Sequence, residues 1–162
     1  MTFEKENQIN FFNLIFLPRW LYFLDPPFLF LTLLVNLAID CLVIYVVLYV
    51  NKIYLEKRKI IKRVFQAWGF GLLADFCAFL LLALLFKGRI GDFYAWRNPL
   101  STVKIVFTIA STGLLIFIFN YSIFLRDGIS KKDCLKIGLS MGLITAPWLF
   151  LLPDTFSQWF KF

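Results

Sequence analysis

Long apolar runs, separated by short polar and basic segments, set the organisation of this chain. A helix of about 20 apolar residues can cross roughly 30 Å of hydrocarbon while it satisfies its own backbone hydrogen bonds. The pattern predicts four transmembrane helices, at about residues 27–50, 66–86, 100–125 and 137–153. We therefore expect an all-α, polytopic membrane helical bundle in which residues 1–162 form a single transmembrane domain.

The segment before the first span is apolar but too short to cross a bilayer. Residues 11–24 are interrupted by Pro18 and Arg19, which favours an N-terminal interfacial helix with Trp20 at headgroup level. The alternative is that 11–24 joins later residues in an extra span, which would move the N-terminus to the other side. The aromatic tail around Trp159 predicts a second interfacial anchor.

Basic residues between the runs predict the orientation in the membrane. Residues 51–65 are predicted to form a basic turn between the first two spans. They hold six Lys and Arg side chains against one acid, and 126–136 hold four more. Because cytoplasmic loops are enriched in Lys and Arg, we expect both segments to be cytoplasmic and both termini to lie on the outer side. Interleaved apolar residues also allow a helix resting on anionic headgroups, through a surface made of Lys57, Arg58, Lys59, Lys62 and Arg63. An acidic partner is the other reading of this surface.

Composition agrees with a membrane protein and narrows the chemistry. Hydrophobic residues make up 60% of the chain, compared with about 45–50% in soluble proteins. The net charge of +7 lies between the apolar runs, which favours headgroups as partners, and we expect no nucleic acid. With no histidine and no paired cysteine motif, the sequence predicts no metal site and no cofactor.

Polar residues inside the first two predicted spans are candidates for function. Thr32, Asn36 and Asp40 recur every four residues and therefore share one helix face. Asp75 lies about as far beyond the basic segment as Asp40 lies before it, so both carboxylates are expected near the membrane midplane. A charged group at that depth costs several kcal/mol unless it faces protein or water. We expect Asn36, Asp40 and Asp75 to form an intramembrane site for ions or helix docking.

The third predicted span adds the only intramembrane cation and three hydroxyl groups. Lys104 either extends outward to the headgroups or reaches inward to a carboxylate. Thr108, Ser111 and Thr112 follow it and are candidates for the same polar site.

Small residues predict where helices approach closely. Gly71 lies on the same side of its helix as Asp75, and the last predicted span carries Gly138, Gly142 and Ala146 at four-residue intervals. Pro147 follows immediately and predicts a kink. The chain also contains a faint internal similarity between 50–59 and 119–128, which indicates either two tandem hairpins or shared composition.

Three functions fit these features. We expect first a subunit or interaction partner of a membrane protein assembly, in contact with other membrane subunits or with copies of itself. The alternative is a small, oligomeric, proton- or cation-coupled transporter that uses the two aspartates. An aspartate enzyme acting on lipid or peptide is the third, and we do not expect it because neither LAIDCLV nor LLADFCA resembles the motifs of intramembrane aspartyl enzymes.

Overall fold

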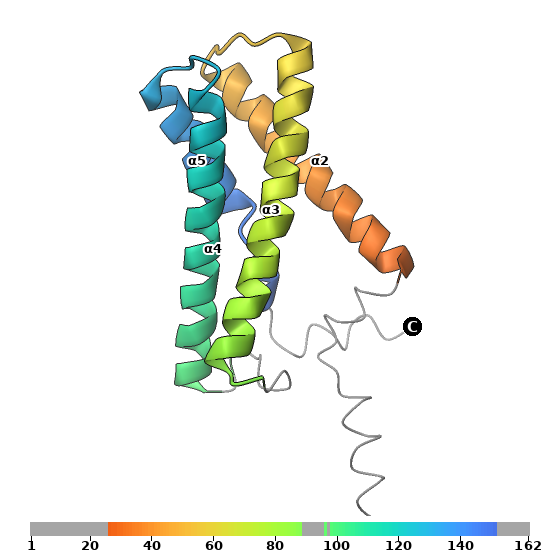
Figure 1. Cartoon of the computed structure of the whole chain (residues 1–162), viewed down its shortest axis with the longest axis vertical. Helices are drawn as coiled ribbons and strands as arrows, with labels where there is room; N and C mark the ends of the chain where they lie inside the picture. The colour runs from red at the N-terminus through yellow and green to blue at the C-terminus, as the bar shows by residue number, and fades with distance from the viewer. Residues whose placement is uncertain (1–25, 89–95, 97, 152–162) are drawn as a thin grey trace, which may run out of the picture.

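The computed structural model describes residues 26–88, 96 and 98–151. In this part of the chain there are no strands, and the elements are α2 (Pro26–Val50), α3 (Lys57–Leu85), α4 (Pro99–Leu125), α5 (Lys131–Ile144) and the 3-10 helix η3 (Trp148–Leu151) (Figure 1). The all-α prediction is confirmed. The predicted helix at 11–24 and the anchor around Trp159 lie outside the described residues.

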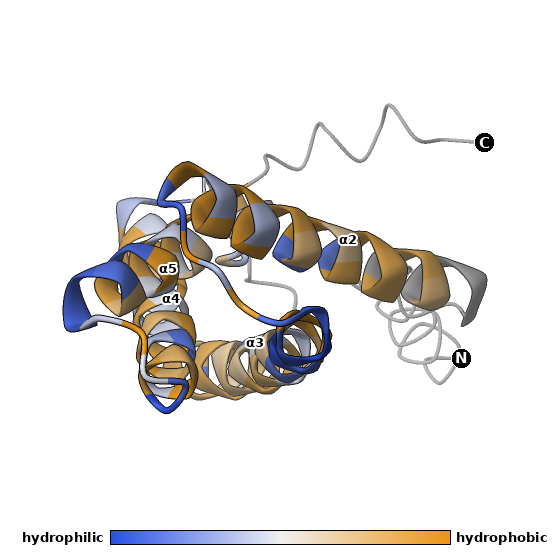
Figure 2. Ribbon diagram, turned by 90° about the horizontal axis from the view of Figure 1, so that it is seen from above, coloured by the Kyte–Doolittle hydropathy of each residue, from blue (hydrophilic) through white to orange (hydrophobic). Residues whose placement is uncertain are grey.

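Three of the described helices, α2, α3 and α4, are long and apolar enough to cross a membrane. Seen from above, the helix surfaces are mostly hydrophobic, and the hydrophilic residues gather at the turns and at the beginnings of α3 and α5 (Figure 2). Large apolar side chains such as Tyr49, Leu84 and Leu143 are exposed. A membrane-embedded protein accounts for this surface, since lipid tails can cover apolar side chains that water cannot.

The fourth predicted helix, 137–153, is not continuous. α5 begins six residues earlier, at Lys131, and ends at Ile144, before η3 follows at Trp148. Pro147 has no N–H to donate to the Leu143 carbonyl, and the Trp148 indole Nε1 donates to that oxygen instead, at 2.7 Å. The last segment is therefore a helix, a break and a short 3-10 turn.

The basic segment is also different from the prediction, because it is helical and not a turn. The turn covers only Asn51 to Glu56, and α3 begins at Lys57. Asn51 ends α2 by donating its side-chain Nδ2 to the Val47 carbonyl at 2.8 Å, and Lys52 has a φ of 53°. Lys and Arg are good helix formers, so the charged residues extend α3 beyond its apolar part.

Helices α4 and α5 pack closely along a seam of glycines. A Cβ atom placed on Gly142 would lie 2.5 Å from the carbonyl oxygen of Gly113, and one on Gly138 would lie 2.8 Å from the Phe117 ring. Ala146 is buried at the end of the same seam. The glycines thus allow the two backbones to touch, as small residues do in other membrane helix pairs.

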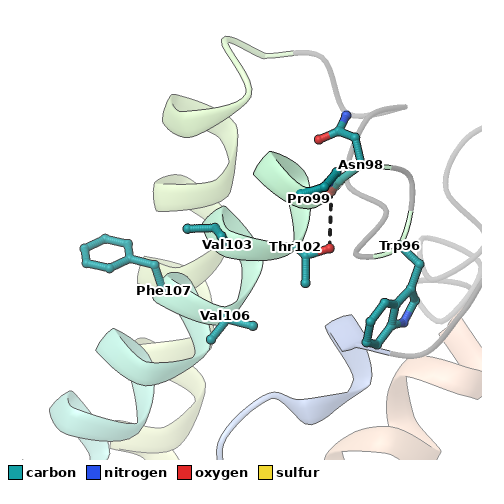
Figure 3. Close-up of a pocket in the computed structure, with 7 residues that line it drawn as sticks. All are labelled: Trp96, Asn98, Pro99, Thr102, Val103, Val106 and Phe107. Carbon is teal, nitrogen blue, oxygen red and sulfur yellow. Dashed lines mark hydrogen bonds between the residues drawn. The ribbon is translucent and has the colours of Figure 1, made fainter.

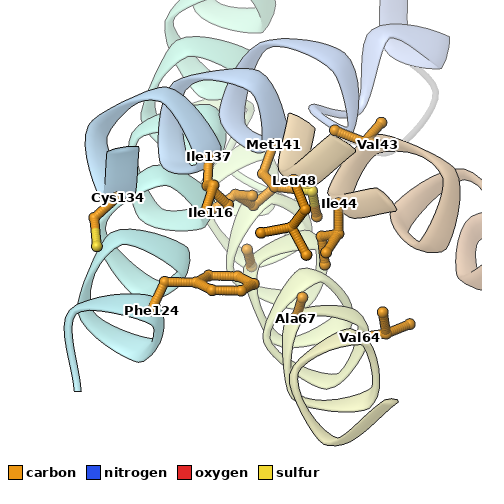
Figure 4. Packing of buried hydrophobic residues seen from close by; sticks show 11 residues of the cluster. Val43, Ile44, Leu48, Val64, Ala67, Ile116, Phe124, Cys134, Ile137 and Met141 are labelled. Atoms are coloured by element: carbon orange, nitrogen blue, oxygen red, sulfur yellow. The ribbon is translucent and has the colours of Figure 1, made fainter. Parts of the chain in front are cut away.

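The main hydrophobic core lies toward the basic end of the bundle, where all four helices meet. Figure 4 shows it as a cluster of side chains from α2, α3, α4 and α5 that includes Ile44, Leu48, Ala67, Ile116, Phe124, Ile137 and Met141. The buried core residues of α2 all come from its C-terminal half. Its N-terminal half diverges from the bundle (Figure 1), leaving Phe30, Leu31 and Leu34 exposed.

An ion pair joins α3 to the turn between α4 and α5. The guanidinium of Arg63 donates two hydrogen bonds to the Asp127 carboxylate, one of them from Nε to Oδ2 at 2.6 Å. The Arg63 side chain is 13% exposed and that of Asp127 is 8% exposed, so the pair is largely shielded from water. The hydrogen bond from Arg63 holds the pKa of Asp127 below its ordinary value.

Replacing Asp127 by asparagine is expected to lower the free energy of unfolding by about 2 kcal/mol, the scale of a hydrogen bond to a charged group. Because the pKa of Asp127 is lowered in the folded protein, its stabilising effect is complete above the ordinary pKa of about 4. That effect is lost as the pH falls through the lowered pKa. Thermal unfolding in detergent at neutral and acid pH measures both results.

Asp133→Asn is the matched control, because Asp133 pairs with Lys136 at a more exposed position, at 3.2 Å. Exposed pairs contribute little to stability. Equal melting temperatures for the two variants at neutral pH would contradict the role given to Asp127.

Candidate functional site

A small cavity lies between α2, α3 and the end of α5. It joins the end of α5 to the two earlier helices, and the two carboxylates predicted at the midplane belong to it. The lining residues are Asn36, Asp40, Trp68, Gly71, Leu72, Asp75 and Thr145.

Helix periodicity positions these side chains. Asn36 and Asp40 are one turn apart on α2, and Gly71 and Asp75 are one turn apart on α3. Asp40 lies about 15 Å along α2 from its end, and Asp75 lies about 15 Å along α3 from the opposite end of the bundle. This distance is half the thickness of a hydrocarbon core of about 30 Å, which is consistent with the prediction of similar depth. The Trp68 indole donates to the Leu33 carbonyl at 3.2 Å and fixes α2 against α3 at this level.

The two carboxylates have no partner among the described residues. Asp40 is only 5% exposed, and its Oδ2 would lie 3.8 Å from a Cβ on Gly71, an ordinary van der Waals distance that places the carboxylate beside α3. The Oδ1 atom of Asp75 is buried and accepts no hydrogen bond. No Lys or Arg lines the cavity. A buried carboxylate without a donor or a counter-charge is unfavourable, and such groups cluster at functional sites.

Three residues of the lining, Trp68, Leu72 and Thr145, were not among the candidates from the sequence, and Thr145 is the one with a hydroxyl group. Its hydroxyl donates to the Met141 carbonyl at 2.8 Å, so the remaining lone pairs of Oγ1 are available as acceptors. It follows directly after α5, at the end where the helix dipole is negative. Its position in the sequence could have indicated this role, because Thr145 is a hydroxyl residue two positions before Pro147, at the predicted kink.

Lys104 contacts neither carboxylate. Its Nζ donates to the Leu85 carbonyl at 2.9 Å, near the C-terminal end of α3, and lies 4.8 Å from the centre of the Phe86 ring. A cation at this position compensates the negative end of the α3 dipole and interacts with the ring face. Lys104 therefore stabilises the end of a helix in this structure.

The three hydroxyl groups of α4 are also directed elsewhere. Each of them donates to the backbone carbonyl four residues earlier, at 2.8–2.9 Å, in Thr108, Ser111 and Thr112. Thr108 and Thr112 are buried in the bundle. None of the three lines the cavity.

The predicted basic surface divides into two parts. Lys57, Arg58, Lys59 and Lys62 are exposed at the beginning of α3, whereas Arg63 turns inward to Asp127. The exposed four remain available to anionic headgroups.

A second hollow lies on the outer face of α4, near its beginning (Figure 3). It is broad and open, and apolar side chains such as Val103, Val106 and Phe107 dominate its lining. One of its polar members, Asn98, caps α4, since its Oδ1 accepts from the Ser101 N–H at 2.7 Å. The hollow thus offers an apolar surface without a reactive group.

No group of three or more metal-ligating side chains occurs in the described part of the chain. Taken with the three long apolar helices, the cavity defines a helical membrane-embedded protein with a buried pair of carboxylates. Comparison of the chain with protein families, with curated proteins and with solved structures gives no match.

Proposed function

We propose that this protein is a small proton- or cation-coupled membrane transporter in which Asp40 and Asp75 form the ion-binding pair. The observation that carries the proposal is the shared cavity of these two buried carboxylates, which have no counter-charge in the described residues. Ionisable residues at this depth that face one another across helices are typical of proton and ion pathways. A proton or a small cation would neutralise the pair.

Docking to a partner explains the same residues less well. Docking through the predicted polar and small residues would need these side chains on the outside of the bundle, and Asp40, Gly138 and Gly142 are all buried inside it. The close contact of Gly142 with Gly113 already uses the small-residue seam within the chain. The internal cavity therefore favours ion binding.

We also propose that α5 and η3 together make a fourth, discontinuous span. Lys131 begins α5 at the basic end of the bundle. At the other end of this segment, the Leu151 carbonyl accepts a hydrogen bond at 2.8 Å from the indole of Trp96, in the loop before α4. The segment thus extends between the two ends of the bundle. Broken helices of this kind are found where the backbone lines an intramembrane site.

The orientation that fits the charges places 51–65 and 126–136 in the cytoplasm and both termini outside, with the exposed basic surface on anionic lipid. Lys59→Cys, in a chain whose native cysteines are replaced, is then expected to resist a membrane-impermeant thiol reagent in intact cells. Lys87→Cys at the opposite end of α3 is the matched control and should be labelled. Labelling at position 59 and protection at 87 would reverse the orientation.

Ion flux into liposomes tests the transport function. We expect purified wild-type protein to dissipate a pH or sodium gradient. The variants Asp40→Asn and Asp75→Asn should lose that flux, because asparagine lacks the negative charge that binds the proton or cation. The two variants must still reconstitute as folded protein, as judged by gel filtration. Equal flux in the wild type and in both variants would reject the proposal.

A second candidate is a subunit of a membrane assembly, and the divergence of α2 favours it. The N-terminal half of α2 leaves the bundle (Figure 1) and exposes Phe30, Leu31, Leu34 and Val35. Four helical segments also enclose an ion path poorly, so we propose that the protein works as an oligomer or beside another membrane subunit. Loss of a co-purifying partner with unchanged flux in the aspartate variants would favour this candidate over transport.

A further inference from the structure

The break in the last helical segment lies at the same cavity as the two carboxylates. Thr145 is the first residue after α5, and it lines the cavity with Asp40 and Asp75. The negative end of the α5 dipole therefore adds to the negative potential of the two acids. Half-helix ends that point into a midplane site coordinate small cations in other membrane proteins.

The size of the cavity limits what can bind. Its volume is about 10 Å³, and about 10–15 Å³, counted in the same way, is needed to hold one water molecule. An organic cation or a hydrated ion is too large for this space. The occupant that fits is a single dehydrated ion or a proton.

Four of the residues that line the cavity carry a hard oxygen that can bind a cation. They are Asp40 and Asp75 with their carboxylates, Asn36 with its amide and Thr145 with its hydroxyl. Transition metals favour imidazole or thiolate ligands, and no such group lines the cavity. Ca²⁺ takes six to eight oxygen ligands and Mg²⁺ usually keeps several waters, for which the space is too small. The hard cation that remains is a dehydrated monovalent ion, held by the side chains of the lining.

Asp40 gives independent support for a ligand at this position. It is 5% exposed and faces the cavity, and no described residue donates a hydrogen bond to it. The hydroxyl of Thr145 donates its proton to the Met141 carbonyl, so its oxygen can only accept from any other group. The Asp40 carboxylate and the Thr145 oxygen can therefore both act as ligands of a positive ion.

We infer that the cavity is a site for a sodium-sized monovalent cation, held by Asp40 and Asp75, with Thr145 at the helix break as a neutral ligand. This inference rests on the proposed function and makes it more specific, because a proton alone would not need Thr145. One such cation together with one proton balances the two negative charges.

Sodium titration of the full-length protein in liposomes tests the assignment. The probes are ²²Na⁺ uptake and the rate at which a pH gradient dissipates in sodium or choline chloride. Thr145→Val keeps the shape of the side chain and removes the hydroxyl. It is expected to raise the sodium concentration for half-maximal uptake about tenfold, the scale of one lost polar contact. Thr145→Ser restores the hydroxyl and should remain within about twofold of the wild type.

The possible outcomes distinguish failure of the sodium site from failure of the proposed transport function. A purely structural role of the Thr145–Met141 hydrogen bond would lower the melting temperature of Thr145→Val and leave its sodium dependence unchanged, which would overturn the inference. The pH gradient could also collapse equally fast in sodium and in choline chloride, but only in protein with both aspartates intact. This result would overturn sodium binding and would still support proton transport. Absence of any flux that depends on Asp40 or Asp75 would overturn both.

Discussion

Wild-type protein freed of ligand is expected to unfold at a lower temperature than its Asp40→Asn,Asp75→Asn variant, although only the wild type transports ions. The two carboxylates share a buried cavity that no cation lines, and Oδ1 of Asp75 has no donor. Asparagine has nearly the same shape as aspartate and carries no charge, so the double substitution removes the cost of burying two negative charges and their mutual repulsion. We expect a gain of about 2 kcal/mol in the free energy of unfolding, the scale on which an unpaired buried charge destabilises a protein.

The sign of this change separates a functional role from a packing role. If the aspartates held α2 and α3 together through hydrogen bonds, their replacement would lower stability. Thermal unfolding in detergent without sodium gives the result, and Ser111→Ala serves as the control because the Ser111 hydroxyl bonds only within its own helix, to Phe107. A melting temperature below that of the wild type, with flux retained, would contradict the ion-site assignment.

Gly142→Ala is expected to cause the largest loss of stability in this protein. The added Cβ would lie 2.5 Å from the Gly113 carbonyl oxygen and 3.1 Å from the Phe117 Cβ. Because a backbone oxygen and a Cβ atom cannot rotate away, α4 and α5 must separate. We expect a loss of about 3 kcal/mol, at the upper end for overpacking, and it outweighs the roughly 1 kcal/mol that alanine gains over glycine in a helix.

Gly69→Ala is the matched control for this prediction. Gly69 lies within α3, and a Cβ there would meet nothing within 4 Å. The same substitution should therefore raise stability slightly, through helix propensity alone. Melting temperatures of the two variants in one detergent give the comparison. A smaller loss in Gly142→Ala than in Gly69→Ala would show that the α4–α5 seam is not tight.

The seam and the cavity are parts of one arrangement. The glycine contacts hold α5 against α4 and thereby fix Thr145, the first residue after α5, relative to the bundle. Helix α2 is held mainly at its C-terminal half, through Ile44 and Leu48. The cavity lies where the tightly packed part of the bundle meets the diverging part of α2 (Figure 1).

The sequence alone determined the class of this protein, because the lengths of apolar runs and the positions of charges follow directly from bilayer thickness and desolvation cost. It predicted α2 and α4 to within a residue, and helix periodicity with equal depth identified Asp40 and Asp75. The prediction of a turn across the basic residues was wrong. α3 begins at Lys57, because charge does not prevent helix formation.

The tertiary structure alone decided which polar groups meet. Lys104 and the α4 hydroxyls were equally good candidates by sequence, since depth and helix face do not say which neighbouring helix a side chain contacts. Packing directed Lys104 to the Leu85 carbonyl and brought Thr145 to the cavity. The kink at Pro147 could be read from the missing N–H, but its position beside two unpaired aspartates depends on the contact between Gly113 and Gly142.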